Sequence, residues 1–270
     1  MDTSSQLDRP VPASSPLPSK LRWSSAWLFP VATPQARAGV LTGALALLTL
    51  LPGWVLNLGY RWEVATRLYT GQSPAFPPLH WSHSVMRQGL IVCQVIALSV
   101  SPGTALALLG ASAWRLGADL LALICWLAAG VLVLAAVLLV PAGMTRLGCE
   151  GDRMVFTAPW RLWRTVRQRL GVYACAWWIT GSAIGVSLGV PVLLGSTWWP
   201  AVQRWAHASP FAGPGPFLEG FPLIAFLIIP LNLVFFFVLS VWAWQVAGYA
   251  FTVALYGAQP QRGQTTAPHA

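Results

Sequence analysis

The chain has 270 residues, of which 56% are hydrophobic and only 9% are charged, and its 16 Lys and Arg outnumber its 7 Asp and Glu. A soluble globular domain carries about a quarter charged residues, so this composition excludes an ordinary water-soluble fold. The net charge of +9 comes mainly from arginines that flank apolar stretches, which favours anionic lipid headgroups over nucleic acid as partners.

The N-terminal segment, residues 1–25, is rich in Pro and Ser and predicts a disordered tail. It lacks the basic-then-apolar order of a signal peptide, so we expect the first apolar stretch to remain in the mature protein. A single membrane domain is expected over residues 26–257, followed by a polar C-terminal tail at 258–270.

Five apolar stretches follow, and each is near or above the roughly 20 residues that cross a hydrocarbon core as a helix. They run over Ala38–Tyr60, Gly89–Ser112, Leu116–Ala142, Leu170–Gly195 and Phe221–Gly257. This pattern predicts an all-α, polytopic membrane protein with four to five transmembrane helices and interfacial amphipathic helices. The last stretch is too long for one upright helix, which predicts either a tilt or an interfacial end that carries Trp242, Trp244 and Tyr249.

The first stretch is expected to be broken by proline at Leu51–Trp54 (LPGW). Proline removes a backbone donor and clashes with the preceding turn. Without the residues that follow the break, Ala38–Leu51 reaches only about 21 Å, which is short of the core of about 30 Å. This element is therefore either a kinked span or a re-entrant pair of helices. A second break is expected at Ser101–Gly103 (SPG).

The distribution of basic residues chooses between these alternatives, because Lys and Arg accumulate on the cytoplasmic side of a membrane. Five crossings would put most of them on the far side, whereas a re-entrant first element leaves only Arg115 and Arg204 there. We therefore expect four spanning helices and two cytoplasmic termini. The predicted location is a prokaryotic cytoplasmic membrane.

Four arginines within Ala158–Leu170 indicate an amphipathic helix. Trp160, Leu162, Trp163 and Val166 share one side of it, which predicts a helix lying at the membrane interface. Its role is either general anchoring or the binding of a specific anionic lipid or cytoplasmic partner. The residues predicted to contact lipid headgroups are Arg61, Arg67, Arg161, Arg164, Arg167 and Arg169.

Gly181, Gly185 and Gly189 repeat at every fourth position, which predicts close packing of helices in lipid. Asn232, two residues after Pro230, is expected to hold helices together through its amide. His80 and His83 make a poor metal site, because no carboxylate or thiol accompanies them. Walker, HExxH and GxSxG motifs are absent from the sequence. We therefore predict no catalytic residue, no cofactor and no metal.

One segment resembles a known family, the prokaryotic membrane proteins catalogued as domain of unknown function 4013 (DUF4013). The segment follows the first apolar stretch and reads Gly-Tyr, a basic helical stretch, Gly, a proline-rich turn with Leu and Trp, and Gly-Leu. The matching positions are Gly59, Tyr60, Arg67, Gly71, Pro78, Leu79, Trp81, Gly89 and Leu90.

The resemblance covers roughly residues 20–256, with specificity confined to this segment. The chain departs from the family pattern at Leu79-His80-Trp81, where such sequences tend to read Leu-Pro-x-Trp followed by acidic residues. The resemblance implies a location and a fold, but no activity. From the residues themselves, we expect Gly59 to let its helix approach the headgroup layer, and Trp81 to lie at the interface.

Together these features predict a non-enzymatic membrane protein that packs against anionic lipids or other membrane subunits. The alternative is a transporter or permease-like carrier of an apolar or lipid-like small molecule. A carrier predicts a cavity near Asn57, Asn232 or the broken backbone at Pro52 and Ser101–Gly103. A packing subunit predicts an exposed small-residue face around Gly181–Gly189.

Overall fold

The computed structural model describes residues 17–18, 20–152, 159–207 and 223–257, which form helices joined by turns and loops. The elements are α1 (Trp23–Leu28), a short 3-10 helix (Phe29–Val31), α2 (Pro34–Leu47), α3 (Leu51–Thr70), α4 (His83–Arg115), α5 (Asp119–Glu150), α6 (Pro159–Gln168), α7 (Leu170–His207) and α9 (Leu223–Tyr256). The prediction of an all-α fold is confirmed.

The N-terminal segment joins the fold earlier than predicted. Leu17 is buried in a core cluster built mainly from α7 and α9, and α1 already begins at Trp23. The folded part therefore starts before residue 26. The rest of the predicted tail, residues 1–16, and the C-terminal tail at 258–270 lie outside the described residues.

The first apolar stretch is broken into two helices, but the break lies at 48–50 and not at LPGW. Leu50 adopts a φ of 58°, and α3 then starts with Pro52 in its first turn. Proline is tolerated there because its missing N–H would have no helical partner. Asn57 fastens the two helices, since its amide donates to the carbonyls of Gly43 (2.9 Å) and Gly53 (2.8 Å).

The second and third stretches form a long hairpin of α4 and α5, and the predicted break at Ser101–Gly103 is wrong. α4 continues through Pro102, and the Ser101 hydroxyl donates to the Leu98 carbonyl at 3.0 Å. That carbonyl is the one that proline leaves without its usual i+4 donor. Packing against α5 keeps the helix continuous, since Gly103 lies directly against Val133.

The last stretch forms a single helix, α9, whose C-terminal part is covered by protein. The Trp242 indole donates to the Trp27 carbonyl at 3.2 Å, and the ring of Tyr249 lies 4.5 Å from that of Phe29. An interfacial end is therefore wrong for Trp242 and Tyr249, because α1 and the residues after it cover this part of α9.

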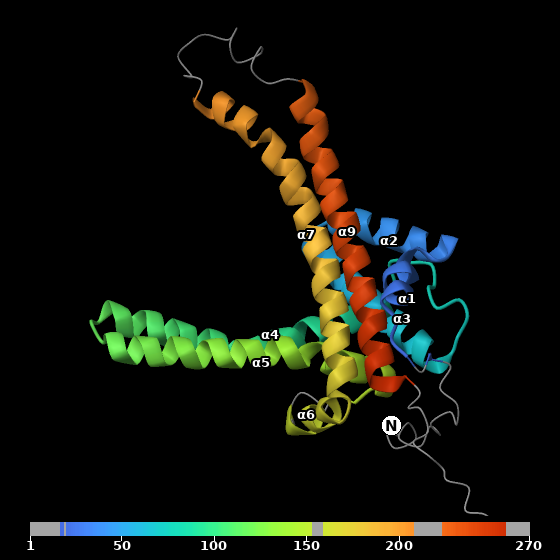
Figure 1. Cartoon of the computed structure of the whole chain (residues 1–270), viewed down its shortest axis with the longest axis horizontal. Coiled ribbons are helices and arrows are strands. Elements are labelled where there is room, and N and C mark those ends of the chain that lie inside the picture. The colour runs from blue at the N-terminus through green and yellow to red at the C-terminus, as the bar shows by residue number, and fades with distance from the viewer. Residues whose placement is uncertain (1–16, 19, 153–158, 208–222, 258–270) are drawn as a thin grey trace, which may run out of the picture.

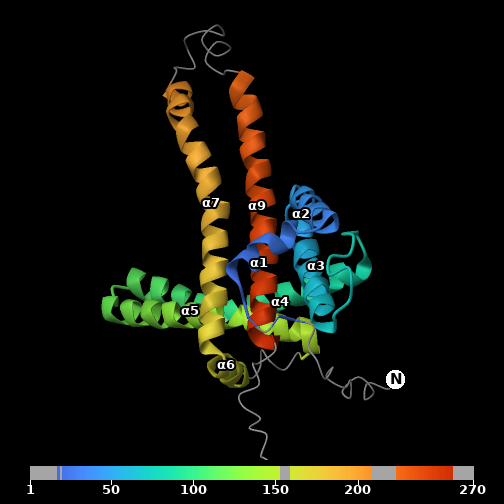
Figure 2. The same ribbon diagram turned by 45° about the vertical axis from the view of Figure 1, so that its right-hand side comes forward.

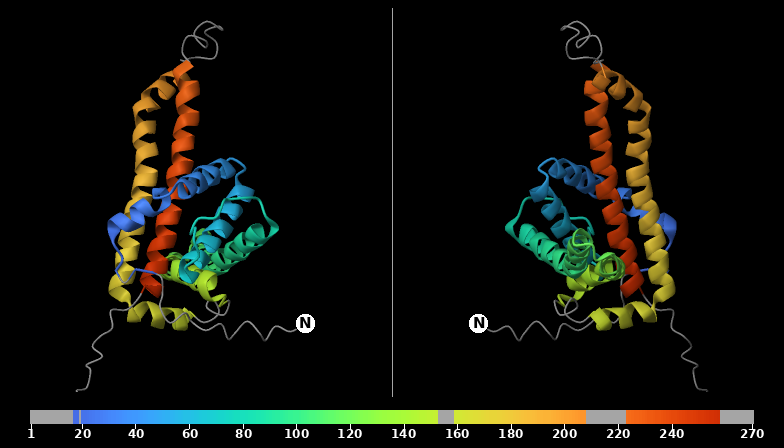
Figure 3. Two further views of the ribbon diagram at one scale, coloured as in Figure 1. Left: turned by 90° about the vertical axis from the view of Figure 1, so that its right-hand side faces the viewer. Right: turned by 90° about the vertical axis from the view of Figure 1, so that its left-hand side faces the viewer.

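Two long hairpins dominate the molecule, and they point in clearly different directions (Figures 1 and 2). α7 and α9 run side by side along one direction, while α4 and α5 extend across it. The shorter α2 and α3 pack to one side of α9, as Figure 3 shows. α6 lies at the N-terminal end of α7, and the C-terminal end of α9 lies on the same side of the molecule.

Within the described residues, four helices are long and apolar enough to cross a membrane. They are His83–Arg115, Asp119–Glu150, Leu170–Thr197 and Ile229–Tyr256. Neither half of the broken N-terminal stretch is among them. The fold is thus that of a multi-pass membrane protein with four candidate spans and a broken N-terminal hydrophobic element.

Candidate functional site

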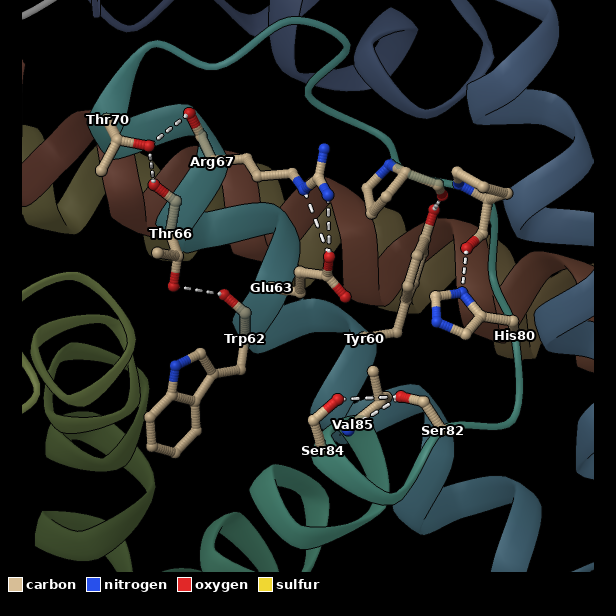
Figure 4. A network of polar contacts seen from close by, with 12 residues as sticks. Tyr60, Trp62, Glu63, Thr66, Arg67, Thr70, His80, Ser82, Ser84 and Val85 are labelled. Atoms are coloured by element: carbon tan, nitrogen blue, oxygen red, sulfur yellow. Dashed lines mark hydrogen bonds and ion pairs between the residues drawn. The ribbon is translucent and has the colours of Figure 1, made fainter.

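The segment that follows the first apolar stretch forms a polar network between α3, the connector at 71–82 and the start of α4 (Figure 4). The buried Tyr60 hydroxyl donates to the Pro77 carbonyl at 2.7 Å and so holds the connector against α3. The Ser82 hydroxyl accepts from the Val85 N–H at 3.2 Å and caps α4. Gly71 ends α3 in the left-handed conformation, with φ of 69°. The contacts of this network fix the path of the chain.

Gly59 and Gly89 create a close crossing of α3 and α4. A β-carbon at Gly59 would collide with the Val85 carbonyl, and one at Gly89 would collide with the Val55 carbonyl. The expectation that Gly59 approaches the headgroup layer is therefore wrong, because the backbone of α4 covers it. Trp81 is exposed.

Two of the arginines predicted to contact headgroups, Arg67 and Arg169, bond to groups of the protein itself. Arg67 pairs with Glu63 one turn earlier on α3, at 3.0 Å. Arg169 donates to the carbonyls of Gly257 (2.9 Å) and Ala254 (3.4 Å), at the C-terminal end of α9. A cation at this end of a helix satisfies carbonyls that have no helical donor.

Arg61 is half-buried where α3, α4, α5 and α9 converge. Its side chain passes over Gly248 of α9, and the described residues offer it no hydrogen bond or ion pair. Burial lowers the pKa of the Arg61 guanidinium to about 10. The side chain therefore stays charged at neutral pH without a counter-charge from the described chain.

The arginines of α6 point away from the protein. Leu162 and Val166 are buried in the core, while the side chains of Arg161, Arg164 and Arg167 are exposed. Trp160 and Trp163 are 62% and 50% exposed beside them. The face predicted to be apolar is thus divided, because its aliphatic part packs on protein and its two indoles remain accessible next to the guanidinium groups.

The predicted packing glycines of α7 face open space. Apart from the nearby backbone of α7 itself, a β-carbon at Gly181, Gly185 or Gly189 would meet no described atom within 4 Å. α7 packs on α9 through the opposite side, where Ala176 and Ile179 are fully buried. The three glycines consequently leave a shallow face on α7 that no described part of this chain covers.

An ionic cluster that the sequence reasoning missed lies at the end of α5. Arg146 pairs with Glu150 at 2.8 Å and with Asp152 at 3.3 Å, and the Tyr256 hydroxyl donates to Glu150 at 2.7 Å. The i, i+4 spacing of Arg146 and Glu150 is a signal that could have revealed the pair. The contact with Tyr256 required the tertiary fold.

Several passages of the chain meet at this same end. The ring of Tyr69, near the end of α3, lies 4.8 Å from that of Tyr256. Arg169, at the start of α7, bonds the Gly257 carbonyl, and the Pro18 carbonyl lies close to Gly257 as well. The chain therefore leaves this end after Pro18, returns to it at the end of α3, and returns again after each long hairpin.

The remaining predicted residues fit structural roles. The Asn232 amide donates to the Pro191 carbonyl of α7 at 3.1 Å, which joins α7 and α9 as expected. The His80 ring contacts the Pro78 carbonyl at 2.9 Å. Across the described part of the chain, no three His, Cys, Asp or Glu side chains gather as a metal site.

Comparisons with known proteins add no relative. No family model, no curated protein and no solved structure matches the chain. The resemblance to DUF4013 therefore stays a prediction.

Proposed function

We propose that this protein is a non-enzymatic membrane subunit that packs against another membrane-spanning helix and against anionic lipids. The uncovered face of Gly181, Gly185 and Gly189 on α7 carries the proposal. Small residues at every fourth position allow two helix backbones to approach closely, and dispersion then favours their association in lipid. A face of this kind that its own chain leaves open is suited to a partner helix.

The exposed arginines and indoles of α6 support the lipid part of the proposal. Guanidinium groups hold phosphates, while indole rings favour the boundary between headgroups and acyl chains. The segment Pro159–Gln168 contains no acidic residue that would compete for these arginines.

We further propose that the end where Pro18, Tyr69, Glu150, Arg169 and Tyr256 meet is cytoplasmic. The return of the chain to this end after α3 supports a re-entrant N-terminal element. The arginines of α6 then lie in the cytoplasm with most other basic residues, in agreement with the positive-inside rule.

A photo-reactive residue at Leu188 tests the partner. This exposed side chain borders the glycine face, so irradiation of native membranes should join it to a protein. The Gly185→Leu variant should abolish that cross-link, since a large side chain separates the two backbones. Leu127, an exposed residue of α5, serves as the control and should cross-link to lipid alone. Cross-links to lipid alone at Leu188 as well would refute the proposal.

A carrier of apolar or lipid-like molecules is the second candidate. It is favoured by an apolar groove at Ser99 and Pro102, beside the position where the sequence predicted a break in α4. A carrier should move a fluorescent phospholipid between leaflets of reconstituted vesicles, whereas a packing subunit should leave the rate of empty vesicles unchanged.

A further inference from the structure

A groove of about 290 Å³ lies where α4, α5 and α6 meet. The residues that line it include Leu98 and Pro102 of α4, Ala135 and Leu139 of α5, and Leu162 of α6. The volume is near the lower end of the roughly 300–1,000 Å³ typical of small-ligand sites. The groove is thus large enough for part of one extended hydrocarbon chain.

The polar groups around the groove are already satisfied within the chain. The Ser99 hydroxyl, which also lines it, donates to the Val95 carbonyl at 2.8 Å. The Leu98 carbonyl released by Pro102 accepts from the Ser101 hydroxyl. With these groups paired, the walls offer an occupant mainly apolar contacts, which suits a hydrocarbon chain better than a polar molecule.

Positive charge lies beside the groove, on the outer face of α6. Leu162 lines the groove, and the neighbouring Arg161 and Arg164 are exposed, with no acidic partner among the described residues. The same end of α6 carries the exposed indoles of Trp160 and Trp163. An occupant with an apolar chain and an anionic head matches both parts of this surface.

We propose that the groove binds one acyl chain of an anionic phospholipid whose phosphate is held by Arg161 and Arg164. This inference rests on the proposed lipid contact of α6 and makes it specific. Ala135 leaves room for the chain, Leu162 joins the apolar and charged parts, and the two arginines select the headgroup by charge.

The test reconstitutes the protein in nanodiscs with equal amounts of phosphatidylglycerol and phosphatidylcholine. The protein is then extracted into mild detergent, and the lipids it retains are identified by native mass spectrometry. The wild type should retain one phosphatidylglycerol. Ala135→Phe should lower the retained fraction by about tenfold, because the ring fills the groove. The double variant Arg161→Gln/Arg164→Gln should lose the preference for phosphatidylglycerol.

Matched controls are Leu127→Phe, at an exposed position of α5 that does not line the groove, and Arg115→Gln at the end of α4. Both should retain phosphatidylglycerol as the wild type does. Ala136→Leu is a second groove-filling variant for the case in which Ala135→Phe does not fold. Unchanged retention in a folded groove variant, or an unchanged preference in the double variant, would overturn the proposal. A dimer that Ala135→Phe abolishes would overturn it in favour of a second copy.

The cross-link at Leu188 separates this proposal from the proposed function. Groove variants should leave that cross-link intact, because α7 presents its glycine face elsewhere. Loss of lipid selectivity with the cross-link retained defines the groove as a lipid site. Absence of the cross-link with lipid selectivity retained would refute the partner proposal alone.

Discussion

Two glycines, Gly59 of α3 and Gly89 of α4, determine how closely these helices cross. Gly59 lies against the Val85 carbonyl, and Gly89 lies against the Val55 carbonyl, so each helix contacts the backbone of the other. In contrast, Gly130 of α5 and Gly181, Gly185 and Gly189 of α7 have open space beside them. The same residue type therefore has opposite sensitivity to substitution at different positions.

We expect Gly59→Ala and Gly89→Ala each to destabilise the protein by about 1–3 kcal/mol, because the added methyl group overpacks the crossing. Gly130→Ala should cause no loss, since alanine favours helix over glycine by about 1 kcal/mol. Thermal unfolding in detergent measures both effects. Equal midpoints for all three variants would contradict the close crossing.

Arg61 provides a second test at the residue scale. We expect Arg61→Met to raise stability by up to about 1 kcal/mol, because it removes a partly desolvated charge that has no partner in the described chain. Arg67→Met should lower stability slightly, by about 0.2–1 kcal/mol, because Arg67 pairs with Glu63 near the surface. A larger loss for Arg61→Met than for Arg67→Met would indicate that Arg61 binds an anion in the membrane.

At the scale of elements, the turn between α2 and α3 makes the first apolar stretch a broken unit. Leu50 holds a positive φ of 58°, which costs a residue with a β-carbon about 1–3 kcal/mol. Its side chain is 74% exposed, so it recovers little from packing within the chain. Asn57 compensates by bonding carbonyls on both sides of the turn.

Leu50→Gly should therefore raise the midpoint of thermal unfolding, because glycine adopts this conformation without strain. Leu48→Gly is the matched control, since Leu48 is also exposed but has a right-handed helical conformation. That control should lower the midpoint, because glycine only adds flexibility there. A fall for both variants would show that the turn is not strained at Leu50.

On the scale of the whole molecule, the directions of the two hairpins limit how the protein can lie in a membrane. They extend in different directions (Figure 1), and helices tilt by no more than about 40° from the bilayer normal. Both hairpins therefore cross one flat membrane only if they tilt to opposite sides. The shared end at Glu150, Arg169 and Tyr256 would then face one compartment.

Single cysteines in a cysteine-free background test this topology. Thr70→Cys and Gln168→Cys should react with a membrane-impermeant maleimide from the cytoplasmic side only, since both residues are exposed near the shared end. Ala118→Cys, at the tip of the α4–α5 hairpin, should react only from the opposite side. Reaction of Thr70→Cys from the outside would exclude a re-entrant N-terminal element.

The sequence by itself determined the class of fold, because long apolar stretches have few stable states other than membrane helices. It also predicted that the first stretch is broken, but it placed the break at Pro52. The break lies before Pro52 instead, because proline fits the first turn of a helix as readily as it ends one. The continuity of α4 through Pro102 was decided by packing against α5.

The candidate surfaces depended more strongly on tertiary structure. The spacing of Gly181, Gly185 and Gly189 predicted a packing face, yet only the fold showed that this chain leaves it open. The sequence does not distinguish these arginines from one another. In the structure Arg67 pairs with Glu63, Arg169 donates to carbonyls at the C-terminal end of α9, and the arginines of α6 are exposed. The physical reason is that spacing defines the face of a helix, whereas only the arrangement of helices decides what that face contacts.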